Sequence, residues 1–280
     1  MDCWYDVNDD KKCSVISVAS GKGGVGKTLT TVHLAYGLAE AGKKVLILDG
    51  DMGLSNVDIV LGLDARYNII DAIEDRVSMA DIILSVTDRI GLISSGSGLI
   101  NLSELSIVQK VKLLDKLDEI SDIFDYLIVD CGAGIGTNVQ HFTNYASTNL
   151  VLTTPEPHSM TDAYATMKVI NQHNRKGTFH LVVNMVKSDS EGQKVYQRIS
   201  DTAARFLNID VKLSGIVHFD GTLSNKIVSS KINRTNVFTT VAGQGWRKVA
   251  HNIKDTLLSS RIPKESLWKS IVHQNREMAI

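Results

Sequence analysis

Short apolar runs alternate along the chain with segments whose apolar residues recur at helical spacing. Runs rich in Val, Ile and Leu occur at Val15 to Val18, Val45 to Leu48, Ile90 to Ile93, Tyr126 to Val129, Leu150 to Leu152, Leu181 to Val183 and Leu213 to Val217. Near-continuous aliphatic residues indicate strands that are covered on both faces, as in a parallel sheet. The pattern therefore predicts a doubly wound α/β fold, with a mostly parallel sheet and helices on both faces.

Two of the intervening segments have the spacing of amphipathic helices. The first runs from Leu34 to Ala41 and is followed by Gly42, a residue suited to end a helix. The second is marked by Val108, Val111, Leu114 and Leu117. Both segments are expected to be crossover helices between parallel strands.

Composition and charge narrow the function classes. The 280 residues are 43% hydrophobic and 22% charged, with a formal net charge of -1. No proline-, glycine- or serine-rich stretch divides the chain, so we expect one main domain over 13–258, between a short tail at 1–12 and a helical tail at 259–280. A nearly neutral chain has no general attraction to polyanions, and we do not expect it to bind nucleic acid.

The N-terminal residues, the lengths of the apolar runs and the cysteines bear on the cellular location of the protein. Residues 1–12 are acidic and lack an apolar core, and no apolar run reaches the roughly 18 residues of a spanning helix. Cys3, Cys13 and Cys131 are odd in number and suggest neither a disulfide framework nor a zinc site. We expect a cytoplasmic protein that is at most peripheral to the inner face of the membrane.

A phosphate-binding motif follows the first predicted strand. It satisfies G-x-x-x-x-G-K-[ST] in the required strand-to-helix context. Glycines let backbone N–H groups approach phosphate oxygens, and the helix that follows offers its positive dipole end. Lys27 should neutralise β- and γ-phosphate charge, and the Thr28 hydroxyl should complete the coordination of magnesium. The predicted contacts to ATP and Mg²⁺ are Gly21, Lys22, Gly23, Gly24, Val25, Gly26, Lys27, Thr28 and the next position, Leu29.

Carboxylates follow two of the predicted strands. Asp49 and Asp51 come after the second strand, and because alternate residues point in opposite directions, one should face magnesium and the other the attacking water. Asp130 ends the fourth run and opens a loop of small residues, which is the layout of a Walker B strand and a second switch. Two acidic residues beside an Asp-Gly turn also have a purely local use in ending a strand. Cys131 is interpreted as a small packed thiol.

The loop carries a second lysine that a general P-loop does not require. With Lys22, the sequence K-G-G-x-G-K-T resembles the deviant Walker A signature of the MinD/ParA/nitrogenase-iron-protein class. The resemblance implies that Lys22 reaches the nucleotide of a second copy in an ATP-dependent homodimer, that Asp51 is the catalytic aspartate, and that Lys22 and Lys27 assist slow hydrolysis of ATP. The alternative is that Lys22 is simply a solvated charge.

Three further stretches, 48–58, 133–136 and 155–165, resemble one branch of this class, the FlhG regulators of flagellar number, also called FleN or YlxH. The most specific is P-E-P-H-S-M-T-D-A-Y-A, from Pro155 to Ala165. The resemblance implies an ATPase switch that controls flagellar number or placement. The same segment also has a local interpretation, in which Ser159 is the N-cap of a helix and Asp162 completes a capping box.

The resemblance also suggests where the base is bound. The family places adenine beside an Asn after the sixth strand and a loop after the seventh, which correspond to Asn184-Met185 and Val217-His218-Phe219-Asp220. An Asn amide offers both a donor and an acceptor to the purine edge. His218 stands where relatives commonly have proline.

Partners follow from the resemblance and from the ends of the chain. The resemblance implies a flagellar regulator or an FlhF-type GTPase as the partner. Residues 1–12, however, lack the glutamine that the family's GTPase-activating helix uses. Leu267, Trp268, Ile271 and Val272 form an apolar stripe that suits either an anionic membrane surface or packing on the domain itself. The alternative functions are a MinD- or ParA-like ATPase for division-site selection or partitioning and, with weaker support, an iron–sulfur carrier.

Overall fold

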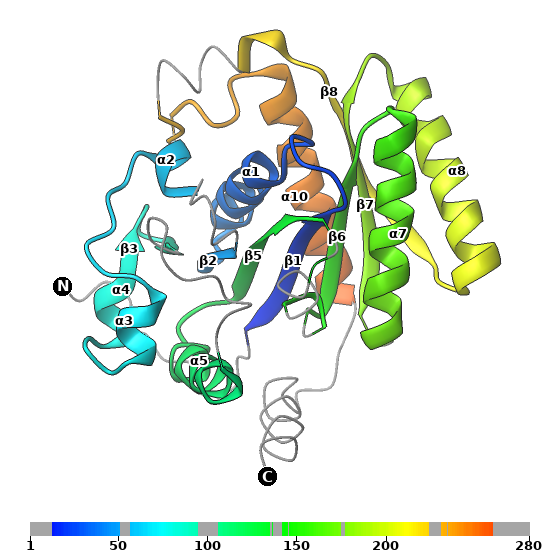
Figure 1. The fold of residues 1–280 in the computed structure, drawn as a ribbon. Coiled ribbons are helices and arrows are strands. Elements are labelled where there is room, and N and C mark those ends of the chain that lie inside the picture. Colours follow the sequence, from blue (N-terminus) through cyan, green and yellow to red (C-terminus); the bar gives the residue numbers. More distant parts are fainter. Residues whose placement is uncertain are drawn as a thin grey trace.

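The computed structural model describes residues 13–50, 57–94, 106–134, 136, 142–144, 146–174, 177–223, 231–233 and 235–259. Within these ranges the chain forms an eight-stranded sheet with helices on both faces (Figure 1). The strand order is β3-β4-β2-β5-β1-β6-β7-β8. Every described pairing is parallel except that of β3 with β4. The predicted doubly wound α/β fold is confirmed.

The strands coincide with the apolar runs of the sequence. Every predicted run lies in a strand, whereas β3 has no counterpart among the predictions, because it is short and antiparallel at the edge of the sheet. The strands are β1 (Ser14–Ser20), β2 (Val45–Gly50), β3 (Ile83–Ser85), β4 (Ile90–Ile93), β5 (Tyr126–Ala133), β6 (Thr148–Thr153), β7 (Thr178–Val186) and β8 (Val211–His218).

Both predicted crossover helices are present, as α1 and α5. Gly42 follows α1 with φ +81°, a left-handed conformation that glycine adopts readily. Val108 was expected on the buried face of α5 but is 66% exposed, whereas Leu113 and Leu117 are buried. No helix in the described ranges is both long and apolar enough to span a bilayer. The helices are α1 (Lys27–Glu40), α2 (Val57–Leu61), α3 (Ile69–Ile73), α4 (Met79–Ile82), α5 (Ile107–Glu119), α7 (Pro157–His173), α8 (Asp189–Leu207) and α10 (Val241–Ser259).

The helices form two layers on the sheet (Figure 1). On one face, α1 and α10 bury Leu34 and Trp246 against the central strands. On the other, α3, α4 and α5 bury Ile73 and Leu117 over β1, β2 and β5. Beside them α7 and α8 cover β6, β7 and β8, with Met167 in the core. The central strand β1 is therefore covered on both faces, and its carboxyl end continues into the loop that begins at Gly21.

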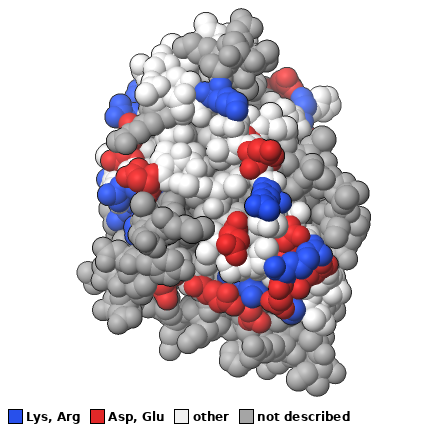
Figure 2. Space-filling view, turned by 90° about the vertical axis from the view of Figure 1, so that its left-hand side faces the viewer, with Lys and Arg blue, Asp and Glu red and all other residues white. Residues whose placement is uncertain are grey.

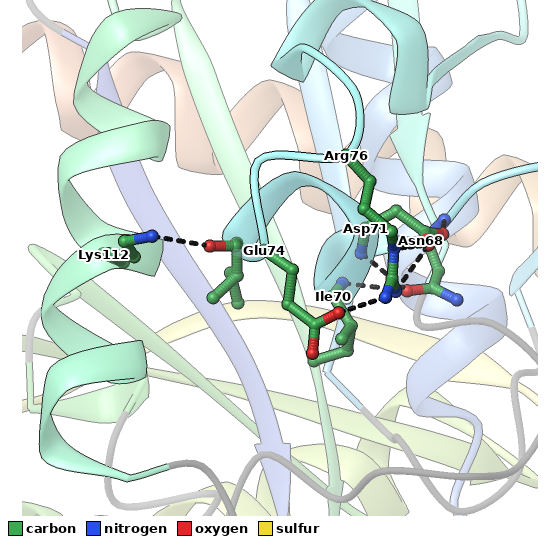
Figure 3. Close-up of polar contacts among 7 residues, drawn as sticks. Asn68, Ile70, Asp71, Glu74, Arg76 and Lys112 are labelled. Atoms are coloured by element: carbon green, nitrogen blue, oxygen red, sulfur yellow. Dashed lines mark hydrogen bonds and ion pairs between the residues drawn. The ribbon is translucent and has the colours of Figure 1, made fainter.

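Local capping and one contact from α5 hold the short helix α3 (Figure 3). The Asn68 backbone N–H donates to Asp71 at 2.8 Å, and the Asp71 N–H donates back to the Asn68 side chain at 3.3 Å. Arg76 pairs with Asp71 at 2.7 Å. From α5, Lys112 donates to the carbonyl of Ile73 at 3.3 Å. Charged side chains thus satisfy backbone groups at both ends of α3.

The face formed by α2, α3 and α4 carries charges of both signs. Figure 2 shows acidic and basic side chains interspersed there. Asp75 alone binds two lysines, Lys112 at 2.7 Å and Lys116 at 3.1 Å. The described part of this face has no continuous basic stripe of the kind that follows a nucleic-acid backbone.

Two histidines are buried in the core. His33 in α1 is 0% exposed, and its Nδ1 lies 2.6 Å from the carbonyl oxygen of Leu29. His180 in β7 is 2% exposed and lies 2.7 Å from the Ser214 hydroxyl. Burial lowers the pKa of each histidine from 6.5 to about 4, because the charged form loses its hydration. Both rings are therefore neutral in the folded protein at neutral pH.

We expect these histidines to make the protein sensitive to acid. As the pH falls from about 6.5 to about 4, the unfolded chain takes up protons that the folded chain does not, so stability is lost across this window. The loss should be roughly 1 kcal/mol per pH unit for each histidine. Urea unfolding at several pH values should show a shallower loss for His180→Gln than for the natural chain.

The exposed His251 provides a matched control, since 68% of its side chain is accessible. The His251→Gln variant should follow the pH dependence of the natural chain. An unchanged slope in the His180→Gln variant would show that His180 does not carry this dependence.

Candidate functional site

A glycine loop connects β1 to α1 at the carboxyl end of the central strand. Gly24 and Gly26 have φ values of +76° and +96°, in the left-handed region that favours glycine. Gly26 is the N-cap of α1, and its carbonyl accepts from the Thr30 N–H at 2.9 Å. The first N–H groups of α1 therefore lie beside the loop, as an anion site requires. The predicted strand–loop–helix context is confirmed.

Lys27 is the buried charge of this loop. Its side chain is at the start of α1, the residue is 8% exposed, and its ammonium donates to the Ser20 hydroxyl at 3.1 Å. Ser20 in turn donates to the carbonyl of Lys22 at 2.7 Å, and its own carbonyl accepts from the Gly134 N–H at 3.0 Å. Ser20 thus connects Lys27, the loop backbone and the segment after β5. Ser20 lies one residue before the phosphate-loop motif, so the motif does not identify it as part of the site.

The other predicted contacts differ in what they can offer a nucleotide. Gly23 is exposed, Val25 is buried, and Thr28 is half-buried on the first turn of α1. Leu29 packs its side chain against the core, so only its backbone is available. The side chain of Leu29 therefore has no group that could bind a phosphate or magnesium.

Lys22 has a partner within its own chain. Its ammonium forms an ion pair with Glu156, the N-cap residue of α7. The two side chains remain 41% and 62% exposed, so the pair contributes little to stability. The hydrogen bond and charge of Lys22 lower the pKa of Glu156. Glu156 lies in the family-specific segment, but no local sequence pattern connects it with Lys22, 134 positions away.

The beginning of α7 packs directly on the loop. A Cβ atom added to Gly21 would lie 2.6 Å from both the Cβ atom and the carbonyl oxygen of Asp162. Glycine is therefore required at this position by contact with the backbone of α7. The segment 155–165, identified by its resemblance to flagellar regulators, is in contact with the phosphate loop.

The capping box expected in this segment is wrong. Glu156 is the N-cap of α7 and Pro157 opens the helix, because proline has a helical φ and the first turn does not need its N–H. Ser159 lies inside the helix, where its hydroxyl accepts from the Thr154 N–H at 3.0 Å. Ser159 therefore ties α7 to the end of β6.

Two of the predicted carboxylates lie side by side at the carboxyl ends of neighbouring parallel strands. Asp49 and Asp130 are paired in register on β2 and β5, and their exposures are 0% and 1%. Asp49 accepts from the Val57 N–H at 3.3 Å, which fixes the start of α2. Asp51 and most of the loop after Asp130 lie outside the described residues, so the catalytic role assigned to Asp51 stays a prediction.

The carboxyl ends of β2 and β5 and the first turn of α1 offer oxygen atoms that could bind magnesium. Carboxylates and a hydroxyl, from Asp49, Asp130 and Thr28, belong to the class of ligand that Mg²⁺ prefers, together with water and phosphate oxygens. Among the described residues, no group of three or more His, Cys, Asp or Glu side chains forms a ready metal site. Carboxylate and hydroxyl oxygens of this kind would suit a magnesium ion that is also held by phosphate oxygens.

Cys131 does not contribute to this chemistry. It follows Asp130 in β5 but is 1% exposed and belongs to the core beneath α3 and α5. The interpretation as a small packed thiol is confirmed.

The residues expected around adenine are brought together by the pairing of β7 with β8, in which Val186 lies opposite His218. His218 lies 3.3 Å from Asp189 at the start of α8. Phe219 is 67% exposed beside this edge. The role of these residues in binding a base stays a prediction.

Asn184 already makes two hydrogen bonds. Its amide nitrogen donates to the carbonyl of Val25 at 2.8 Å, and its oxygen accepts from the Met185 N–H at 2.9 Å. One amide N–H and one lone pair of the oxygen remain for another partner.

Comparisons with known proteins show the family to which the chain belongs. Residues 13–183 match a family model described as an AAA domain. The chain is 37% identical over 206 residues to the antiactivator FleN of Pseudomonas aeruginosa, covering 74% of each protein. It is 32% identical over 255 residues to the flagellum site-determining protein YlxH of Helicobacter pylori, covering 90% of this chain and 86% of that protein.

Solved structures give the same fold. The MinC:MinD cell division protein complex of Aquifex aeolicus contains a chain that is 26% identical, with a TM-score of 0.69, covering 91% of this chain and 99% of that chain. The site lies at the carboxyl ends of the strands of this sheet. It consists of the phosphate loop, the paired carboxylates Asp49 and Asp130, and the beginning of α7. The chain therefore belongs to the FleN/YlxH family, a branch of the MinD-like P-loop ATPases.

Proposed function

We propose that the protein is a switch that dimerises when it binds ATP and Mg²⁺, hydrolyses ATP slowly, and thereby regulates flagellar number or placement. The observation that carries this proposal is the pair of lysines on one loop. Lys27 is buried at the start of α1, whereas Lys22 extends at the surface. A buried lysine suits the protein's own nucleotide, and an exposed one can reach a second copy.

Each residue would have a separate task in the ATP-bound state. The N–H groups of the loop and Lys27 would hold the β- and γ-phosphates, while Thr28 and the water around Asp130 would complete the magnesium shell. Asp51 would orient the attacking water. Magnesium would neutralise phosphate charge, and Asp49 would hold the first switch in place through its bond to Val57.

Dimerisation would require Lys22 to exchange one anion for another. Within a single chain its ammonium pairs with Glu156. The phosphates of a nucleotide bound to the second copy carry more negative charge than one carboxylate and are more strongly attracting. ATP would thereby favour the dimer without any new charged residue.

The biological output is inferred from the relatives. FleN is named an antiactivator and YlxH a flagellum site-determining protein. A flagellar regulator or an FlhF-type GTPase would be the partner, and the cytoplasm or the inner face of the membrane would be the location. The apolar stripe at 267–272, which lies outside the described residues, would make any contact with anionic lipid.

The second candidate is control of cell division. The similarity to the MinD chain of a cell division complex favours it. Against it, the alignment covers 74% of FleN and 86% of YlxH but 68% of the septum site-determining protein MinD of Helicobacter pylori. Deletion of the gene distinguishes the two. Altered flagellar number with normal septum position supports the flagellar role, whereas misplaced septa with normal flagella would favour division.

We expect the Asp51→Ala variant to accumulate as a dimer with ATP and magnesium, because ATP binding is retained while hydrolysis is slowed. Light scattering after size exclusion should show dimer with ATP and monomer with ADP. Lys27→Ala is the control and should remain monomeric, since its loop loses the charge that holds the phosphates. A monomer at saturating ATP in the Asp51→Ala variant would contradict the dimer switch.

The contact of α7 with the loop gives a second prediction. In Gly21→Ala the new Cβ would overlap the backbone of Asp162, so α7 must shift, and we expect a loss of about 1–3 kcal/mol in the free energy of unfolding. In Gly23→Ala the nearest atom is 3.9 Å away, at Ala133, and stability should change by less than about 0.5 kcal/mol. Urea unfolding without nucleotide measures both. Equal stability of the two variants would mean that α7 does not press on Gly21.

A further inference from the structure

The end of β7 approaches the phosphate loop from outside the motif. Asn184 is 3% exposed and lies 159 positions from Val25 in the sequence, yet its amide nitrogen donates to the carbonyl of Val25 at 2.8 Å. The bond connects the strand that leads to the expected base site with the loop that is expected to hold phosphates. It is a direct link between two parts of one site.

The bond also fixes the direction of a loop N–H group. In a planar trans peptide the carbonyl of one residue and the N–H of the next point in opposite directions. Because the Val25 carbonyl points toward Asn184, the Gly26 N–H of the same peptide group must point away from Asn184. A phosphate loop works only while its N–H groups converge on the anion, so the orientation of this peptide group matters for binding.

Gly26 and Asn184 fit each other closely. A Cβ atom on Gly26 would lie 2.6 Å from the Asn184 amide nitrogen, and the φ of Gly26 is +96°. The loop can therefore adopt this shape beside Asn184 only with glycine at position 26. The packing and the hydrogen bond restrain the same peptide group.

The strand is shaped to deliver this side chain. The register between β7 and β8 shifts between Val183 and Val186, and Met185 has a φ of +59°, which is uncommon for a residue other than glycine. The Asn184 oxygen accepts from the Met185 N–H at 2.9 Å and so supports this local bend. An irregularity at a strand end commonly redirects a side chain toward a site.

We propose that Asn184 is a positioning residue that holds the phosphate loop in its binding shape before a nucleotide arrives. This inference rests on the proposed nucleotide-binding function and goes beyond contact with adenine. A residue that only reads the base affects ligands that contain a base. A residue that braces the loop also affects the binding of bare phosphate chains.

The test compares two ligands in the full chain. Calorimetry with magnesium measures the affinity for ATP and for inorganic tripolyphosphate, which has no base. In Asn184→Ala we expect both affinities to fall by about tenfold, the size of one lost hydrogen bond worth about 1.4 kcal/mol. Asn184→Asp should be at least as weak, because a carboxylate oxygen would face the Val25 carbonyl.

Asn174→Ala is the matched control. Asn174 is also buried, at 5% exposure, and its amide donates to the carbonyls of Thr143 and Ala146 at the opposite end of the strands. This variant should bind both ligands within about twofold of the natural chain, whatever its stability. An Asn184→Ala variant that binds tripolyphosphate like the natural chain would overturn the brace, whether or not its ATP affinity falls.

A second measurement needs no ligand. Hydrogen exchange of the amides at 21–26 should be faster in Asn184→Ala than in Asn174→Ala and the natural chain, and equal exchange would overturn the brace. If the natural chain binds no ATP, the proposed function fails, while the exchange experiment still decides the role of Asn184.

Discussion

A loop of backbone N–H groups binds phosphate only while those groups point to one place, and this orientation is the constraint on which the site depends. Peptide groups in a short loop have many alternative orientations, and an empty loop has no anion to select one. The protein supplies the selection from its own residues. Gly26 takes the left-handed conformation at φ +96°, and the Val25 carbonyl is held outward by Asn184 at 2.8 Å. The binding shape is thereby largely prepared in advance.

The same loop contacts α7 and the segment after β5, the two elements that would respond to a nucleotide in the proposed switch. Gly21 contacts α7 at Asp162, and Ser20 receives a bond from Gly134 in the segment after β5. Lys22 pairs with Glu156 at the first turn of α7. A change of charge at the phosphates would therefore be felt by α7 and by the second switch. If the protein is the proposed ATP switch, these contacts would carry the effect of nucleotide binding to α7 and to the segment after β5.

The fold could be predicted from the sequence because its strands are buried on both faces. Runs such as Val45 to Leu48 and Tyr126 to Val129 have no polar alternation, and each is a strand of the sheet. The edge strand β3 lacks this signal, since it is short and only half-buried. The prediction of Ser159 as a helix cap is wrong because α7 already begins at Pro157.

The candidate site was predicted in part for a similar reason. The P-loop is a continuous motif, so the sequence reveals it directly, and the carboxyl ends of parallel strands bring Asp49 and Asp130 to it. The contacts of Asn184 with Val25 and of Lys22 with Glu156 join residues more than 130 positions apart. They depend on how the strands are ordered, which a local pattern does not contain.

The central claim is that Lys22 serves the dimer while Lys27 serves the bound nucleotide. The most direct test is to measure ATP affinity and oligomeric state of a Lys22→Ala variant in the same samples, by calorimetry and sedimentation velocity with magnesium. We expect each Lys22→Ala monomer to bind ATP with nearly natural affinity and not to dimerise. A variant that dimerises with ATP as the natural chain does would contradict it.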